Sequence, residues 1–254
     1  MREQTLEVRT PDGAMDTFLA LPDAGGPFPP VVLFMDIWGM RDQIRDISRG
    51  VAAEGFACAA PDLYYRAGGR HFDRRHPDGR SKSIAILEPD DRQAMIDYSS
   101  HLTDDMVVSD ADALMAQLRT VDGVGQGPAG CFGYCMGGRH VVRVAAALPD
   151  LFRATASFHG TRLVTDGPDS PHLSASAIRG EIYFGYGELD GFTPPEVIAT
   201  MRDAFADAPA VYSDRVHPGA HHGYAIPDRD VYDAAAGKTD WETVFGMFRR
   251  LPDA

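Results

Sequence analysis

Long apolar runs are absent from this sequence. A membrane-spanning helix needs about 20 predominantly apolar residues. The two best candidates, residues 31–38 and 141–148, are short and are interrupted by Asp36 and Arg143. The first residues, MREQT, lead into no apolar segment of the kind that a secretory signal requires. We therefore expect a cytoplasmic protein with no membrane partner.

Positive charge is also scarce. The chain has 24 Lys and Arg residues against 37 Asp and Glu residues, which gives a formal net charge of −13. Such a surface repels the phosphates of a nucleic acid. The arginine pairs at residues 74–75 and 249–250 are too short to form a basic patch. We therefore expect no nucleic-acid partner.

Cysteine is rare, since the chain has only Cys58, Cys131 and Cys135. Three cysteines cannot all pair with one another, and disulfide frameworks belong to oxidising compartments. The sequence therefore predicts free thiols in a reducing compartment. Cys58 and Cys131 lie in apolar stretches and are predicted to be core residues.

The rest of the composition is that of an ordinary globular protein. Of the 254 residues, 44% are hydrophobic and 24% are charged. These values exclude a largely disordered chain, a collagen and a coiled coil. No internal repeat and no low-complexity linker divides the sequence, so we expect one domain over residues 1–254, as a monomer or a small homo-oligomer.

Strand and helix patterns alternate along the chain. Continuous apolar runs at residues 31–35 and 129–134 are typical of strands buried on both faces. Apolar residues at helical spacing indicate a helix over residues 103–119. Residues 66–82 carry few apolar side chains and are expected to form a long surface loop. Further strands are predicted at residues 4–9, 15–21, 56–60, 153–158, 181–185 and 210–217, and further helices at residues 44–51, 136–148, 194–205 and 241–248.

This order of elements predicts the fold class. Two opening strands followed by alternating strands and helices indicate an α/β fold with a mostly parallel central sheet and helices on both faces. In such sheets, functional sites lie at the carboxyl ends of the strands. Polar residues that follow the predicted strands are therefore the first candidates for chemistry.

The strongest such signal is the motif GYCMGG at residues 133–138, where an apolar strand ends and an amphipathic helix begins. This is the context of the nucleophile elbow, G-x-S-x-G, with Cys135 in place of serine. The nucleophile occupies a sharp turn, and Gly133 and Gly137 stand where a side chain would clash with neighbouring backbone. The N-terminus of the helix favours a thiolate at this position.

A cysteine nucleophile needs a base and a group that orients the base. In this architecture the chain order is nucleophile, acid, histidine. Asp190 follows one of the later predicted strands, with Glu188 as the competing acid. His222 follows the last predicted strand, and the competing bases are His217 and His221.

Taken together, these motifs resemble those of the dienelactone hydrolase family. The resemblance rests on GYCMGG at residues 133–138, ELD at 188–190 and GAHHGY at 219–224, and APDLY at 60–64 is similar to the family's loop after the preceding strand. It extends from about residue 4 to the C-terminus. The resemblance implies an α/β-hydrolase fold with a Cys-His-Asp triad.

Matched to the family pattern, Cys135 is the nucleophile, His222 is the base and Asp190 is its partner. The pattern of a histidine, a small residue and an aromatic residue fits His222 and not His221. These assignments are what the resemblance implies for the three catalytic positions.

Other roles follow from the same resemblance. The backbone N–H groups of Ile37 and Met136 correspond to the family's oxyanion hole. Asp36 stands where the family has a glutamate that holds the resting thiol, and we expect this shorter side chain to tune Cys135. Near the mouth of the site, the candidates for substrate contact are Trp38, Tyr64 and His159.

The resemblance implies hydrolysis of a small-molecule ester or lactone through an acyl-thioester, with no metal, nucleotide or organic cofactor. Family enzymes that act on dienelactone hold its carboxylate with arginines, but Ile226 stands at one of the matching positions. Candidates for the other position are Arg66, Arg74, Arg75, Arg80 and Arg92. We therefore expect a substrate other than dienelactone. An acyl-transfer or redox thiol protein and a non-catalytic binding protein on the same scaffold are the alternatives.

Overall fold

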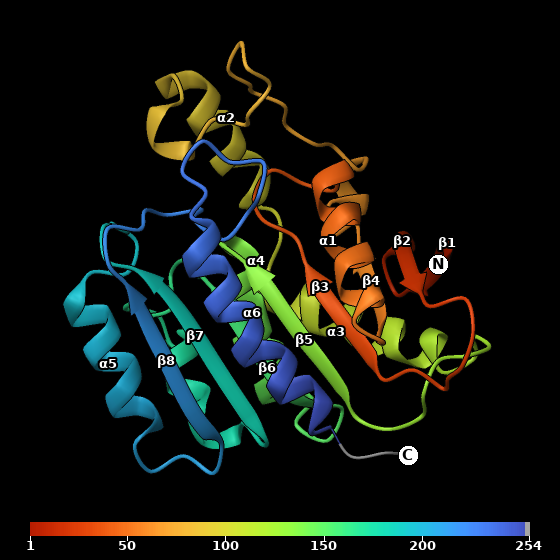
Figure 1. Cartoon of the computed structure of the whole chain (residues 1–254). Helices are drawn as coiled ribbons and strands as arrows, with labels where there is room; N and C mark the ends of the chain where they lie inside the picture. The colour runs from red at the N-terminus through yellow and green to blue at the C-terminus, as the bar shows by residue number, and fades with distance from the viewer. Residues whose placement is uncertain (252–254) are drawn as a thin grey trace.

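A mixed β-sheet runs through the centre of the protein. The computed structural model describes residues 1–251, and within them eight strands share one sheet (Figure 1). The strands are β1 Arg2–Thr10, β2 Gly13–Leu21, β3 Pro30–Phe34, β4 Ala57–Pro61, β5 Ala129–Tyr134, β6 Phe152–Phe158, β7 Glu181–Gly187 and β8 Val211–His217. They lie side by side in the order β1-β2-β4-β3-β5-β6-β7-β8.

The pairing is antiparallel at one edge of the sheet and parallel elsewhere. β2 pairs antiparallel with both β1 and β4. From β4 to β8, each neighbouring pair is parallel. Every residue of β3, β4 and β5 is buried, which accounts for their continuous apolar sequences. The predicted α/β class with a mostly parallel sheet is confirmed.

Helices cover both faces of this sheet. The helices of the described residues are α1 Asp42–Ala53, α2 Pro89–Ser99, α3 Asp104–Leu118, α4 Met136–Ala147, α5 Pro195–Phe205 and α6 Ala234–Arg249, and the short 3-10 turns are η1 Tyr65–Ala67, η2 Ile84–Ile86 and η3 Pro171–Ala177. In Figure 1, α6 crosses in front of the strands and α4 lies behind β5. No helix within residues 1–251 has the length and apolar character needed to cross a membrane.

The helix α2 was not predicted from the sequence. Its apolar residues Ala94, Met95 and Ile96 are consecutive rather than spaced by a helical turn, and Met95 is the buried one. Pro89 at the start and two acidic residues in the first turn favour the helix locally instead. A helix that buries so little of its surface leaves no periodic pattern in the sequence.

The predicted loop at residues 66–82 begins with η1 and is mostly exposed, but it is tied to the body of the protein. The Ser81 N–H donates to the Asp228 carbonyl at 2.7 Å, and the Ser81 hydroxyl donates to the Asp228 carboxylate at 2.7 Å. A His76 ring nitrogen lies 2.9 Å from the Asp230 carboxylate. These contacts hold the loop against the segment that follows β8, at the carboxyl ends of the parallel strands.

The turn between β5 and α4 brings three backbone segments close together. Cys135 links the two elements and has a positive φ of 54°, which residues other than glycine rarely adopt. A Cβ added at Gly133 would overlap the carbonyl of Gly137, and one added at Gly137 would overlap the carbonyl oxygens of Phe34 and Met35. The predicted requirement for glycine at both positions is confirmed.

This crowding makes a direct prediction for stability. We expect Gly137→Ala to lower the free energy of unfolding by about 3 kcal/mol, because the new methyl group would push apart α4 and β3. Gly50→Ala is the matched control. A Cβ at Gly50 in α1 meets no atom within 4 Å, so alanine is expected to raise stability by about 0.5–1 kcal/mol. Urea denaturation measures both values, and equal stabilities of Gly137→Ala and the wild type would contradict the close approach.

Candidate active site

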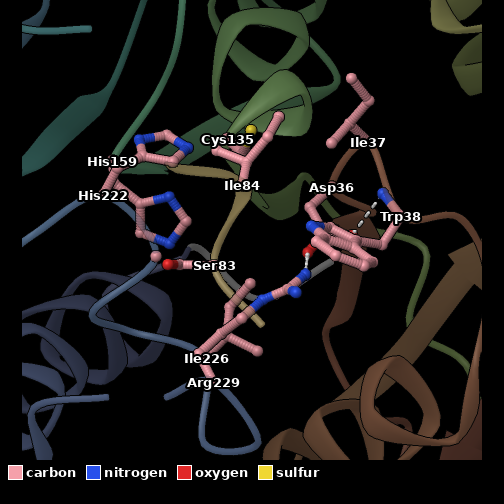
Figure 2. Close-up of a pocket in the computed structure, with 11 residues that line it drawn as sticks. Asp36, Ile37, Trp38, Ser83, Ile84, Cys135, His159, His222, Ile226 and Arg229 are labelled. Atoms are coloured by element: carbon pink, nitrogen blue, oxygen red, sulfur yellow. Dashed lines mark hydrogen bonds and ion pairs between the residues drawn. The ribbon is translucent and has the colours of Figure 1, made fainter. Parts of the chain in front are cut away.

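A pocket opens at the carboxyl ends of the parallel strands (Figure 2). Its walls combine the loop after β3, the β5–α4 turn, the end of β6, the segment at η2 and the loop after β8. Cys135, His159 and His222 line one side, while Asp36 and Arg229 line another. Across residues 1–251, no group of three or more His, Cys, Asp or Glu side chains is arranged to hold a metal ion.

Cys135 lines this pocket with 8% of its surface exposed. Its N–H donates to the Phe158 carbonyl at 3.1 Å, and its own carbonyl accepts the Thr161 N–H at 3.1 Å. The turn is therefore bonded to the end of β6 on both sides of the cysteine. Cys58 and Cys131 are fully buried in the core, where burial raises the pKa of each thiol to about 12. Their predicted core positions are confirmed.

His222 and Asp190 reach the site from separate loops and contact each other. The Nδ1 of His222 donates to Oδ2 of Asp190 at 2.8 Å. The other Asp190 oxygen accepts the Phe192 N–H at 2.8 Å, and the carboxylate is fully buried. Because Nδ1 is occupied, Nε2 of His222 is the nitrogen left for proton transfer, and it has no hydrogen-bond partner among the residues described.

The competing acid, Glu188, and the competing bases, His217 and His221, lie outside the pocket. The Glu188 carboxylate accepts the Gly219 N–H at 2.8 Å. The Nε2 of His217 bonds to the buried Asp240 carboxylate, and His221 is exposed. None of these acid or base candidates lines the pocket.

The protonation of His222 depends on its two neighbours. Burial lowers the pKa of His222, but the negative charge of a Cys135 thiolate and the hydrogen bond to Asp190 together raise it to about 10. A pKa this far above its ordinary value favours the protonated imidazole at neutral pH. A thiolate is the nucleophilic form of cysteine, so this charge distribution suits attack on an electrophile.

Asp36 is held by two arginines on the opposite wall. Arg41 donates to both Asp36 oxygens, at 2.6 and 3.0 Å, and Arg229 donates to Oδ2 at 2.8 Å. The Trp38 N–H completes the set at 3.1 Å. Burial raises the pKa of Asp36, but the two guanidinium groups lower it to about 2. No hydrogen bond within residues 1–251 joins Asp36 to Cys135, so any influence on the thiol acts through charge.

Sequence patterns missed both of these arginines. The Arg229 guanidinium packs over the Trp38 ring, 4.0 Å from its centroid, and donates to the Lys82 carbonyl at 3.0 Å. Figure 2 shows its side chain reaching across the pocket toward Asp36. No motif spacing links Arg229 to these partners, and only the fold brings them together. The arginines considered from the sequence do not line the pocket: Arg66, Arg74, Arg75, Arg80 and Arg92.

Trp38 and Ile37 line the pocket, whereas Tyr64 does not. The Tyr64 hydroxyl donates to the Ile37 carbonyl at 3.0 Å, and its ring packs edge-on against Tyr98 at 4.9 Å. In the structure Tyr64 supports the loop after β3, and its contact with substrate stays a prediction. Met136 begins α4, so its N–H has no partner within the helix.

His159 lies beside His222 in the pocket wall (Figure 2). Its side chain is fully buried, and the two ring centroids are 4.9 Å apart at an interplanar angle of 76°. No group in the described chain hydrogen-bonds either ring nitrogen of His159. Burial and then the charge of His222 hold the pKa of His159 well below its ordinary value, so the ring is neutral. Leaving a buried polar atom unpaired costs about 1–3 kcal/mol.

Comparison with known proteins identifies the family. The chain matches the family model described as "Dienelactone hydrolase family" over residues 15–251. It belongs to the dienelactone hydrolase family. The resemblance found in the sequence motifs is confirmed, and with it the assignment as a hydrolase.

Individual relatives of this dienelactone hydrolase family member extend over nearly the whole chain. A "Putative carboxymethylenebutenolidase" from Synechocystis sp. is 28% identical over 235 residues, covering 91% of this chain and 90% of the relative. A protein of the same name from Escherichia coli (strain K12) is 29% identical over 262 residues, covering 96% and 90%. The crystal structure of a "Putative Dienelactone Hydrolase" from Klebsiella pneumoniae has a TM-score of 0.84 at 24% identity, covering 98% of both chains. This structural likeness shows the shared fold.

The charge coupling in the pocket of this dienelactone hydrolase family member can be tested by titration. We expect Cys135→Ala to lower the pKa of His222, because the thiolate charge is a main cause that raises it. We expect the imidazole to lose its proton near pH 10 in the wild-type protein and at lower pH in the variant. Ring resonances followed by NMR report this titration. Cys58→Ala, which alters a core thiol away from the pocket, is the control and leaves the curve unchanged. Coinciding curves for Cys135→Ala and the wild type would show that the two side chains do not interact.

Proposed function

We propose that this chain hydrolyses an ester or lactone bond through a triad of Cys135, His222 and Asp190, with an acyl-thioester intermediate. One observation carries this proposal. A cysteine at positive φ shares a pocket with a histidine whose Nδ1 is held by a buried carboxylate and whose Nε2 is unpartnered. This arrangement supports the roles of nucleophile, base and orienting acid in acyl transfer.

Acylation starts from the Cys135–His222 ion pair. The thiolate attacks the carbonyl carbon, a sulfur–carbon bond forms, and the carbonyl electrons move to oxygen. When the carbon–oxygen bond to the leaving group breaks, Nε2 of His222 donates its proton to the departing alkoxide, while Asp190 keeps the imidazole oriented. The products of this step are an alcohol, or the hydroxyl end of an opened lactone, and an acyl-thioester on the cysteine.

The backbone N–H groups of Ile37 and Met136 stabilise the oxyanion of the tetrahedral intermediate. Met136 lies at the N-terminus of α4, where the helix dipole adds positive potential. The loop of Ile37 is fixed by the Tyr64 hydroxyl, which binds the Ile37 carbonyl. Preorganised donors of this kind contribute about 3–4 kcal/mol each.

Deacylation returns the protein to its starting state. After acylation His222 is neutral, and its Nε2 takes a proton from water as the hydroxide attacks the thioester carbonyl. The carbon–sulfur bond then breaks, the carboxylic acid product leaves, and Cys135 is released as a thiolate beside the protonated His222.

The substrate we propose differs from dienelactone. Ile226 forms part of the pocket wall, where an apolar side chain binds no carboxylate. Arg229 also lines the pocket, but its guanidinium already binds Asp36 and the Lys82 carbonyl. With Trp38 and Ile84 as further apolar walls, the pocket suits a small acyl group. The name carboxymethylenebutenolidase, carried by the curated relatives, supports lactone or ester chemistry of this kind.

Asp36 has an indirect role in this proposal. It fixes the guanidinium of Arg41. Burial lowers the pKa of Arg41, and the charges of Asp36, Asp228 and Cys135 raise it. The Arg41 guanidinium is therefore close enough to interact electrostatically with the sulfur of Cys135. By holding Arg41 in place, Asp36 tunes the thiol without touching it.

The cellular setting follows from the same features. The free thiols Cys58, Cys131 and Cys135 support a reducing compartment, which we take to be the cytoplasm. The acidic chain supports a small-molecule substrate rather than a nucleic-acid partner. We propose that it acts as a monomer or a small homo-oligomer.

Turnover of a panel of p-nitrophenyl esters and lactones tests this function. We expect Cys135→Ala to abolish hydrolysis and Asp190→Asn to lower kcat about 10,000-fold, because the amide leaves the imidazole in the wrong tautomer. Cys131→Ala is the control for a cysteine outside the pocket and keeps turnover close to wild type. A single burst of product without turnover would indicate an acyl-transfer thiol instead. Inertness toward every ester and toward iodoacetamide would leave a binding protein.

A further inference from the structure

His159 is a pocket residue that the proposed reaction does not use. Its side chain is fully buried, and within residues 1–251 no protein atom hydrogen-bonds its Nδ1 or its Nε2. The unpartnered Nε2 of His222 is accounted for by proton transfer, but the two nitrogens of His159 are not. A buried imidazole that lines a pocket without polar partners is poised for a group that arrives with the ligand.

The backbone of His159 fixes this position. The residue follows β6 with a positive φ of 39°, and its N–H donates to the Gly185 carbonyl at 2.8 Å. Since Cys135 is itself bonded to the last residue of β6, Phe158, the nucleophile and His159 belong to one rigid unit. A ligand group that contacts the His159 ring therefore lies next to the carbonyl that the sulfur attacks.

Aromatic neighbours hold the ring in place. Its centroid lies 4.9 Å from that of His222, 5.6 Å from that of Tyr224 and 5.7 Å from that of Tyr134. These rings pack around His159 without giving it a hydrogen bond. These contacts fix the orientation of the imidazole in the pocket wall before a ligand binds.

Charge decides what kind of group fits. Two cations, His222 and Arg229, face His159 and oppose a further positive charge in this wall. The charge of Asp36 is already neutralised by its two arginines. The ring is therefore neutral, with one N–H donor and one bare nitrogen acceptor. A hydroxyl group both donates and accepts, so it pairs with such a ring in either tautomer.

We propose that His159 determines specificity by hydrogen-bonding a hydroxyl group on the acyl part of the substrate, so that hydroxylated esters or lactones are preferred over their plain analogues. This inference rests on the proposed function, because the hydroxyl is placed relative to the carbonyl that Cys135 attacks. A site whose buried polar groups are satisfied by the substrate rejects the analogue that lacks the group.

Matched esters test the proposal. For p-nitrophenyl butyrate and its 2-hydroxy and 3-hydroxy derivatives, kcat/KM is divided by the rate of uncatalysed hydrolysis of each ester. The wild-type protein is expected to prefer a hydroxylated ester by about 10-fold or more. His159→Phe is expected to lose this preference, so that its normalised kcat/KM on the hydroxylated esters falls to its value on the plain butyrate. His159→Asn, which tolerates positive φ and keeps a donor and an acceptor, retains part of it. His101→Phe, at an exposed histidine outside the pocket, is the control and keeps the full preference.

A binding measurement keeps the proposal testable even if the His159 variants do not fold. In Cys135→Ala, the ring nitrogen resonances of His159 are expected to shift on addition of 2-hydroxybutyrate or 3-hydroxybutyrate, and not on addition of butyrate. Equal normalised rates on plain and hydroxylated esters, an equal loss on all of them in His159→Phe, or resonances that ignore the hydroxyl group would overturn the role of His159. Absence of any ester hydrolysis in the wild-type protein would instead overturn the proposed function, and the resonances would still decide the hydroxyl contact.

Discussion

The turn at Cys135 is the constraint on which the rest of the site depends. A residue other than glycine at positive φ costs about 1–3 kcal/mol and persists only where its surroundings hold it. Here the surroundings are the backbones of β3 and α4, in contact at Gly137, and the end of β6, bonded to Cys135 through Phe158 and Thr161. The same packing presents the sulfur to the pocket and leaves the Met136 N–H free at the start of a helix. One local geometry thus positions both the proposed nucleophile and a proposed donor for the oxyanion.

Two sets of charged residues face each other across this pocket. In the proposed thiolate–imidazolium state, the Cys135–His222–Asp190 set carries one excess negative charge, and Asp36 with its two arginines carries one excess positive charge. Buried charge is costly unless it is paired and hydrogen-bonded. The two sets compensate each other, which helps to explain how a buried site keeps so many ionised side chains. Neutral His159 lies within this arrangement and adds hydrogen-bonding capacity without adding charge.

The sequence predicts the parts of this arrangement that depend on local patterns. Strands buried on both faces appear as continuous apolar runs, and the glycines around Cys135 mark the turn because the backbone there allows no side chain. The proposed partners Asp190 and His222 could be named from chain order and family resemblance, and the structure joins them by a hydrogen bond.

Other features have no local signature. Arg41 and Arg229 come from distant segments and meet at Asp36 only in the folded chain. The helix α2 buries mainly Met95 and leaves no periodic pattern. The place of Tyr64 after β4 indicates a position near the pocket, but its hydrogen bond to the Ile37 carbonyl has no signature in the sequence. In each case side-chain packing between separate elements decides the outcome, and single-sequence patterns do not encode it.

Trapping of the covalent intermediate tests the central claim most directly. The protein is mixed with a p-nitrophenyl ester, quenched with acid during turnover, digested and analysed by mass spectrometry. The account predicts that the peptide containing Cys135 gains the mass of the acyl group, while the peptides with Cys58 and Cys131 stay unmodified. Release of p-nitrophenol with the acyl group on a different residue, or with Cys135 unmodified throughout the burst, would contradict it.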